Sequence, residues 1–165
     1  MESIGKLRNM TAIYLTYQGK ILLLHRHGSK VVDNMWVGAA GGHFEEYELN
    51  DAKACVLREM EEELAVTEDM ICHLQLRYVS LRWTKGEIRQ NYYFFADLKE
   101  DIGDKLSSNE GELKWFDVEE LSELNMPFSA KYMMEHYVSV GRHNDKLYGG
   151  VADGTKVVFI EMPEF

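Results

Sequence analysis

Three glutamates near the end of one predicted helix, Glu59, Glu62 and Glu63, form the residue pattern with the clearest chemical meaning. At about 100° per residue, these positions lie within roughly a third of the helix circumference. Like charges so close together repel one another, and the negative end of the helix dipole adds to the cost. A divalent cation such as Mg²⁺, Mn²⁺ or Ca²⁺ would balance them, because hard oxygen ligands suit these ions. Taken alone, the pattern also fits a solvated acidic face on which Arg58 pairs with Glu62.

The glycine-rich segment before this helix favours the interpretation as a metal site. Residues 38–42 (GAAGG) are too small to fill a core, which indicates backbone that lies close to a ligand. The helix itself is predicted to run from Asn50 or Asp51, either of which is a suitable N-cap, to Leu64. Together the two features predict a loop–helix unit that is able to hold a metal-bound diphosphate.

The elements that must position this unit are strands interspersed with helices. Runs of β-branched and aromatic residues separated by glycine-containing turns predict the strands. The predicted strands are 11–17, 21–24, 71–83, 87–98, 113–116, 147–151 and 157–161, and the further predicted helices are 118–124 and 129–138. This order predicts an α/β or α+β fold with a mixed sheet.

The glycines and the helix together resemble the signature of the Nudix hydrolase family, G-x5-E-x7-R-E-U-x-E-E-x-G-U, where U is bulky and apolar. The second half matches closely, from Arg58-Glu59-Met60 to Val66, and the resemblance extends over at least residues 10–140. It implies the Nudix fold, a mixed β-sheet sandwiched between helices. The sequence departs from the signature in two places. Nine residues instead of seven separate Glu48 from Arg58, and Ala65 replaces a glycine, at a cost of about 1 kcal/mol if that residue is left-handed.

The longer loop leaves the first glutamate of the signature open, since Glu45 or Glu46 could take the place of Glu48. The other ligands follow from the resemblance residue by residue. Glu59, Glu62 and Glu63 would hold Mg²⁺, with Mn²⁺ as an alternative, and the Gly42 carbonyl would be a further metal ligand. Arg58 would orient the glutamates through charge-assisted hydrogen bonds.

The implied reaction is attack by water on a phosphorus of a nucleoside diphosphate linked to a further group. Glu62 or Glu63 is a candidate general base, as is a carboxylate of the later acidic loop, with Glu110 preferred over Glu112. The same loop is also compatible with a plain exposed acidic turn.

The resemblance is strongest to mutator-type members, which implies hydrolysis of a nucleoside triphosphate such as 8-oxo-dGTP to a monophosphate and pyrophosphate. Asn125 and Arg26 are the predicted substrate-binding residues, although Asn125 also fits a helix N-cap. The alternatives are an ADP-ribose or dinucleotide pyrophosphatase and a catalytically silent nucleotide-binding module. An isopentenyl-diphosphate isomerase is disfavoured, because Cys55 and Cys72 are better explained as small core residues.

Composition sets the remaining expectations. The length of 165 residues predicts a single domain at 1–165, with a C-terminal hairpin extension at about 144–165. A net charge of −10 argues against nucleic acid as a partner. The sequence contains no apolar run long enough to span a membrane. We therefore expect a cytoplasmic protein, monomeric or homodimeric, that binds a small-molecule nucleotide.

Overall fold

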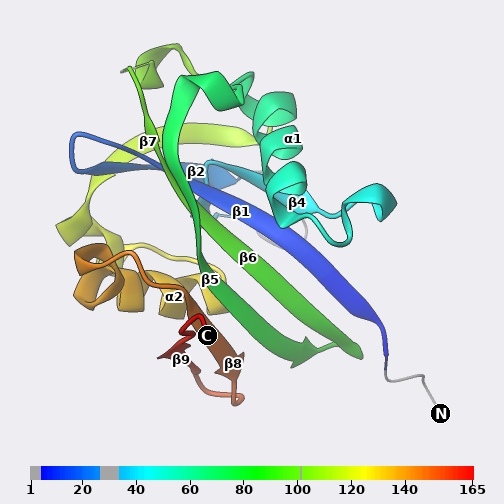
Figure 1. Ribbon diagram of the computed structural model, residues 1–165. Helices are drawn as coiled ribbons and strands as arrows, with labels where there is room; N and C mark the ends of the chain where they lie inside the picture. Colours follow the sequence, from blue (N-terminus) through cyan, green and yellow to red (C-terminus); the bar gives the residue numbers. More distant parts are fainter. Residues whose placement is uncertain (1–4, 27–33, 101) are drawn as a thin grey trace.

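The computed structural model describes residues 5–26, 34–100 and 102–165, and its main feature is one mixed β-sheet (Figure 1). The strand order is β3-β2-β1-β6-β5-β8-β9, while β4 also pairs with β1 and β7 also pairs with β2. The strands are β1 (Leu7–Tyr17), β2 (Lys20–Arg26), β3 (Trp36–Gly38), β4 (Ala40–His43), β5 (Ile71–Thr84), β6 (Glu87–Leu98), β7 (Gly111–Asp117), β8 (Tyr148–Ala152) and β9 (Val157–Glu161). The helices are α1 (Ala52–Leu64) and α2 (Phe128–Ser139), and the 3₁₀ segments are η1 (Glu46–Glu48), η2 (Glu68–Met70), η3 (Gly103–Lys105), η4 (Val118–Glu123) and η5 (Gly141–His143).

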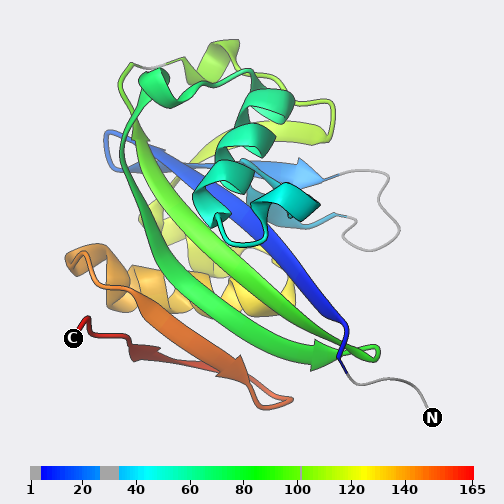
Figure 2. The ribbon, with the colours of Figure 1, turned by 45° about the vertical axis from the view of Figure 1, so that its right-hand side comes forward.

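Helices α1 and α2 cover opposite faces of this sheet (Figures 1 and 2). The protein has two hydrophobic cores, one on each face of the sheet. Strand β1 contributes to both, because successive side chains of a strand point to opposite faces. Ile13 packs in the cluster beneath α1, and Tyr14 packs in the cluster beneath α2. The predicted mixed sheet between helices is thereby confirmed. Within the described ranges, no helix combines the length and the apolar character that crossing a membrane requires.

One edge of β1 is shared by two strands, and this fork places the functional site. Residues Met10–Ile13 pair with β4, whereas Leu15–Tyr17 pair with β2. The opposite edge of β1 pairs in parallel with β6 along almost its whole length. Tyr14 therefore lies at the point where the two partners of β1 diverge.

The tight turns agree with the sequence. Gln18 and Gly19 both have positive φ, 50° and 79°, and so do Lys85 and Gly86, 50° and 75°. Two successive residues of this kind form the hairpin turn that matches the twist of antiparallel strands. At the C-terminal end, Gly154 has a φ of 98° between β8 and β9, and β8 pairs in parallel with β5. The C-terminal hairpin thus continues the main sheet.

Two predicted segments have a different structure. The segment 118–124, predicted as a helix, forms the short 3₁₀ helix η4 and ends at Glu123. Part of the glycine-rich segment 38–42 forms strand β4, although glycine has a low strand propensity. Pairing with β1 supplies the hydrogen bonds that hold this segment extended.

Candidate active site

Helix α1 is held so that two of its carboxylates, Glu59 and Glu63, face β4. Asp51 is the N-cap, and its side chain accepts a hydrogen bond of 3.0 Å from the Ala54 backbone N–H. Met60 and its apolar neighbours are buried against the sheet. The helix ends at Leu64, and its C-cap Ala65 has a φ of 55° in the left-handed region and donates its N–H to the Glu61 carbonyl. The glycine of the family pattern is therefore replaced by alanine at a position whose backbone favours glycine.

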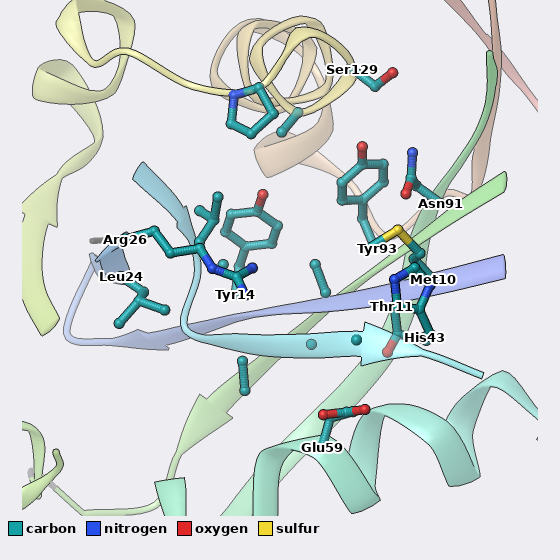
Figure 3. A pocket seen from close by; sticks show the side chains of 18 of the residues that line it. Met10, Thr11, Tyr14, Leu24, Arg26, His43, Glu59, Asn91, Tyr93 and Ser129 are labelled. Carbon is teal, nitrogen blue, oxygen red and sulfur yellow. The ribbon is translucent and has the colours of Figure 1, made fainter. Parts of the chain in front are cut away.

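A cavity of about 520 Å³ lies beside this helix, at the fork of β1 (Figure 3). Its acidic part is lined by Glu59, Glu63 and Glu110. In Figure 3 Glu59 projects from α1 at one side of the view, while Ser129 at the start of α2 lies at the opposite side. The side chains that complete the far part are aromatic, apolar and amide groups together with two arginines, namely Met10, Arg82, Arg89, Asn91, Tyr93 and Phe128.

Arg58 organises the acidic part by contacting three carboxylates. Its Nε and Nη2 donate to the two carboxylate oxygens of Glu48, each at 2.9 Å. Its Nη1 lies 3.0 Å from Glu59 Oε1 and 3.0 Å from Glu62 Oε2. The Glu48 side chain is only 1% exposed, and its hydrogen bonds with Arg58 hold its pKa below the usual range. The longer loop before α1 therefore places Glu48 against Arg58, while Glu45 lines the cavity instead.

Glu59 and Glu63 are crowded in a way that favours a cation between them and the glycine strand. Burial, followed by the charge of Glu59, raises the pKa of Glu63 to about 8. The Gly41 N–H donates to Glu63 Oε2 at 3.3 Å, so that the carboxylate is fixed against β4. A Cβ on Gly42 would collide with the Glu59 carboxylate, so that any larger residue there would displace this carboxylate from its present position. This set of carboxylates beside a backbone strand fits a hard divalent cation.

The structure brings together most of the predicted site residues. Glu59, Glu63, Gly42, Glu110 and Arg26 all line the cavity. Arg26 Nη2 lies 3.2 Å from Glu110 Oε2, which joins the predicted substrate-binding residue to the predicted base. The Gly42 carbonyl oxygen lies 3.8 Å from Cys55 Sγ.

Four of the predicted catalytic, metal-binding and substrate-binding residues are not among those that line the cavity, namely Arg58, Glu62, Glu112 and Asn125. The Glu62 side chain is 59% exposed and pairs with Arg58, and Glu112 is exposed on β7. Asn125 is exposed as well, and its backbone carbonyl accepts a 2.8 Å hydrogen bond from the Trp36 N–H. The neighbouring residues Pro127 and Phe128 line the cavity in its place.

Sequence reasoning missed the residues that β6 contributes. Arg89, Asn91 and Tyr93 share one face of β6, since side chains two residues apart point the same way. The alternation of side chains along the predicted strand 87–98 indicated that these three residues share a face. It did not indicate that β6 pairs in parallel with β1, and this pairing brings that face to the cavity.

The mixed sheet between two helices, with a carboxylate-bearing helix beside a glycine-rich strand, defines a Nudix-type domain. The family model described as NUDIX domain matches residues 6–137, and the chain belongs to this family. It is a hydrolase of nucleoside diphosphate-linked substrates, and Nudix hydrolases generally use a divalent metal. None of the curated proteins matches the chain.

Solved structures share the fold at low sequence identity. The mutator MutT protein from Bacillus halodurans is 22% identical with a TM-score of 0.68, over 96% of this chain and 99% of that one. The MutT protein from Methanosarcina mazei Go1 is 19% identical with a TM-score of 0.65, over 87% and 100%. The NUDIX domain of Shewanella oneidensis NrtR, solved with ADP ribose, is 15% identical with a TM-score of 0.57, over 84% and 88%.

Proposed function

We propose that this protein hydrolyses a nucleoside triphosphate, with 8-oxo-dGTP or another non-canonical nucleotide as the leading candidate, to a nucleoside monophosphate and pyrophosphate. The observation that carries the proposal is the continuity of the cavity. It joins the crowded carboxylates Glu59 and Glu63 to a region lined by Tyr93, Asn91 and Phe128. One end suits a metal-bound phosphate chain, and the other end suits a planar base.

The phosphate end would hold Mg²⁺, with Mn²⁺ as an alternative. Glu59 and Glu63 are the proposed ligands, and the Gly42 carbonyl is a further candidate. Glu62 would join them by turning away from Arg58, since its side chain is exposed. When bound, the cation supplies neutralisation of phosphate oxygens and activation of water. Arg58 fixes the direction of Glu59 through the 3.0 Å contact and so acts as a positioning residue.

Glu110 is the proposed general base. It lines the cavity, and its charge is close enough to Glu63 to contribute, after burial and Glu59, to the raised pKa of Glu63. Arg26 holds the Glu110 carboxylate at 3.2 Å. Among the described residues, the Arg26 Nε is a buried nitrogen without a hydrogen-bond partner. A buried unpaired donor is costly, and we propose that a shift of the Arg26 side chain on substrate binding would let a phosphate oxygen in the cavity accept from it.

The base end is formed by β6 and the start of α2. Tyr93 supplies an aromatic surface, and Asn91 supplies both an amide donor and a carbonyl acceptor. Phe128 is held in place by Arg82, whose guanidinium carbon lies 4.3 Å from the ring centroid. We therefore propose Asn91, in place of Asn125, as the residue that recognises the base edge.

A nucleotide panel tests the proposed reaction. Purified protein with Mg²⁺ is incubated with 8-oxo-dGTP, dGTP, ADP-ribose or a dinucleoside tetraphosphate, and the nucleotide products and any released pyrophosphate are separated and quantified by ion-exchange chromatography. We expect pyrophosphate from the triphosphates, loss of turnover in Glu63→Gln, and normal turnover in Glu61→Gln, an exposed position of the same helix. Preference for ADP-ribose or the dinucleotide would replace the proposed substrate. Tight nucleotide binding without turnover would favour a binding module.

A matched pair of variants tests base recognition. Asn91→Ala is expected to raise KM for the preferred nucleotide about tenfold, the equivalent of one hydrogen bond worth about 1.4 kcal/mol. Asn125→Ala changes an exposed side chain and is expected to leave KM unchanged. The reverse result would indicate that Asn125 recognises the base.

The substrate class and the free cysteines fit a reducing cytoplasmic location.

A further inference from the structure

We propose that Cys72, His73 and Asp97 form a second metal site, which takes a thiophilic divalent cation such as Zn²⁺. Each residue offers one ligand atom, and these atoms all lie within 4.8 Å of one another. None of the three lines the catalytic cavity. They lie where β5 begins after η2 and where β6 ends, in a part of the molecule that the proposed reaction does not use.

A β-bulge creates the cluster. In a regular strand Cys72 and His73 would point to opposite faces, because side chains alternate. Here Cys72 pairs with Asp97, and the next pair is Gln75 with Phe95, so β5 uses one residue more than β6 over this stretch. His73 has a φ of 56° within the bulge. This backbone turn brings the His73 ring to the side of the sheet on which Cys72 and Asp97 face each other.

The Asp97 carboxylate is oriented by two partners. Thr16 Oγ1 donates a hydrogen bond to Asp97 Oδ1. The other oxygen, Oδ2, lies 2.9 Å from His73 Nδ1. A carboxylate fixed on one oxygen presents the other in a constant direction, which is how neighbouring groups preorganise metal ligands. Thr16 is therefore a positioning residue for this site.

The donor set distinguishes this site from the catalytic one. A thiolate, an imidazole and a carboxylate are the ligands of Zn²⁺, at about 2.3 Å for sulfur and about 2.0–2.2 Å for nitrogen and oxygen. The all-oxygen cluster of Glu59 and Glu63 prefers Mg²⁺ instead. Side-chain rotations would have to bring the three donor atoms around one ion, and His73, with 77% of its side chain exposed, has room to rotate.

Binding is balanced by release of a proton. The Cys72 thiol loses its proton as the sulfur–metal bond forms, and the proton passes to solvent, since thiolate is the metal-binding form. Three protein ligands leave the fourth tetrahedral position to water. The site therefore needs no residue beyond those already in the bulge and its partner strand.

Cobalt absorption tests the proposal in the whole 165-residue chain. Chelator-treated Glu59→Gln/Glu63→Gln protein, in which the catalytic carboxylates are removed, is titrated with Co²⁺ in the presence of excess Mg²⁺. We expect a sulfur-to-cobalt charge-transfer band that saturates at one equivalent. We also expect the visible bands of tetrahedral cobalt and displacement of cobalt by Zn²⁺. Because this background lacks the catalytic ligands, the outcome is independent of the proposed hydrolase reaction.

Matched variants assign the ligands. Cys72→Ser is expected to abolish the band, whereas Cys55→Ala, which removes the other cysteine, is expected to retain it. His73→Asn keeps a residue that tolerates positive φ and is expected to lose the tetrahedral spectrum. Thr16→Val is expected to weaken cobalt binding by about 10–100-fold. Absence of a thiolate band at stoichiometric Co²⁺ in folded protein, checked by circular dichroism, would overturn the proposal, as would a band that persists in Cys72→Ser.

Discussion

The buried pair formed by Arg58 and Glu48 gives the sharpest energetic prediction. In Arg58→Met the Glu48 carboxylate, 1% exposed, loses both of its 2.9 Å hydrogen bonds to the guanidinium. Breaking a buried ion pair from one side costs about 3–5 kcal/mol, because an uncompensated charge stays behind. Two charge-assisted hydrogen bonds at about 1.5–3 kcal/mol each give about 3–6 kcal/mol, which overlaps this range. We therefore expect a loss of about 3–5 kcal/mol in the free energy of unfolding.

Urea denaturation followed by circular dichroism, at neutral pH and without metal, measures this loss. The double variant Arg58→Met/Glu48→Met is expected to recover most of it, since two apolar side chains can replace a buried pair at little cost. Lys53→Met on the same helix is the matched control. Its partner Glu68 is 3.0 Å away but both side chains are more than half exposed, so the cost should stay below about 1 kcal/mol.

Measurement of turnover distinguishes two roles of Arg58, stabilisation of the fold through Glu48 and positioning of Glu59 and Glu62. The double variant should fold well yet turn over slowly, because Glu59 and Glu62 have lost the Nη1 contact that directs them. A double variant no more stable than Arg58→Met, or single variants that cost less than about 1 kcal/mol, would refute the reasoning. Full activity in the stable double variant would refute the positioning role of Arg58.

Three further predictions concern α1 and the sheet. Ala65→Gly should raise the free energy of unfolding by about 0.5–1 kcal/mol in urea, because relief of the left-handed backbone outweighs the added flexibility of the unfolded chain. Glu63 has a folded pKa of about 8 against a usual 4.5, so metal-free wild type should lose stability as the pH rises from 4.5 through 8. Glu63→Gln should remove this dependence and be the more stable protein above pH 8 in thermal melts with a chelator. Arg77 is buried and donates to the carbonyls of Gly141, Asn144 and Lys146, so Arg77→Met should cost about 2–4 kcal/mol, measured by urea denaturation.

Residues close together in the sequence were sufficient to predict helix α1 and the hairpin turns. The helix follows from its Asp51 cap and a run of helix-forming residues, and the turns follow from Gly19 and Gly86. The family of the chain and the crowded pair of Glu59 and Glu63 could also be predicted, because both depend on residues close together in sequence. These features need no information about distant partners.

Features that depend on distant partners were not predictable. Whether the longer loop would displace Glu48 depended on η1, a 3₁₀ turn that absorbs the loop and directs Glu48 toward Arg58. The position of Asn91 at the cavity depended on which strand lies beside β1. Cys72 was expected to be buried like Cys55, yet the bulge at His73 leaves it only partly covered. In each case long-range pairing, rather than local propensity, decided the position.

The fork of β1 has a consequence for how this enzyme can change over generations. The proposed metal end of the cavity is built by α1 and β4, and the proposed base end by β6 and the start of α2. Substitutions at Asn91 or Phe128 can therefore alter which nucleotide fits while leaving the contacts of Arg58, Glu59 and Glu63 intact. Strand β1 pairs with β4 on one edge and with β6 on the other. It therefore separates the residues that the proposed metal chemistry constrains from those that can vary with the nucleotide.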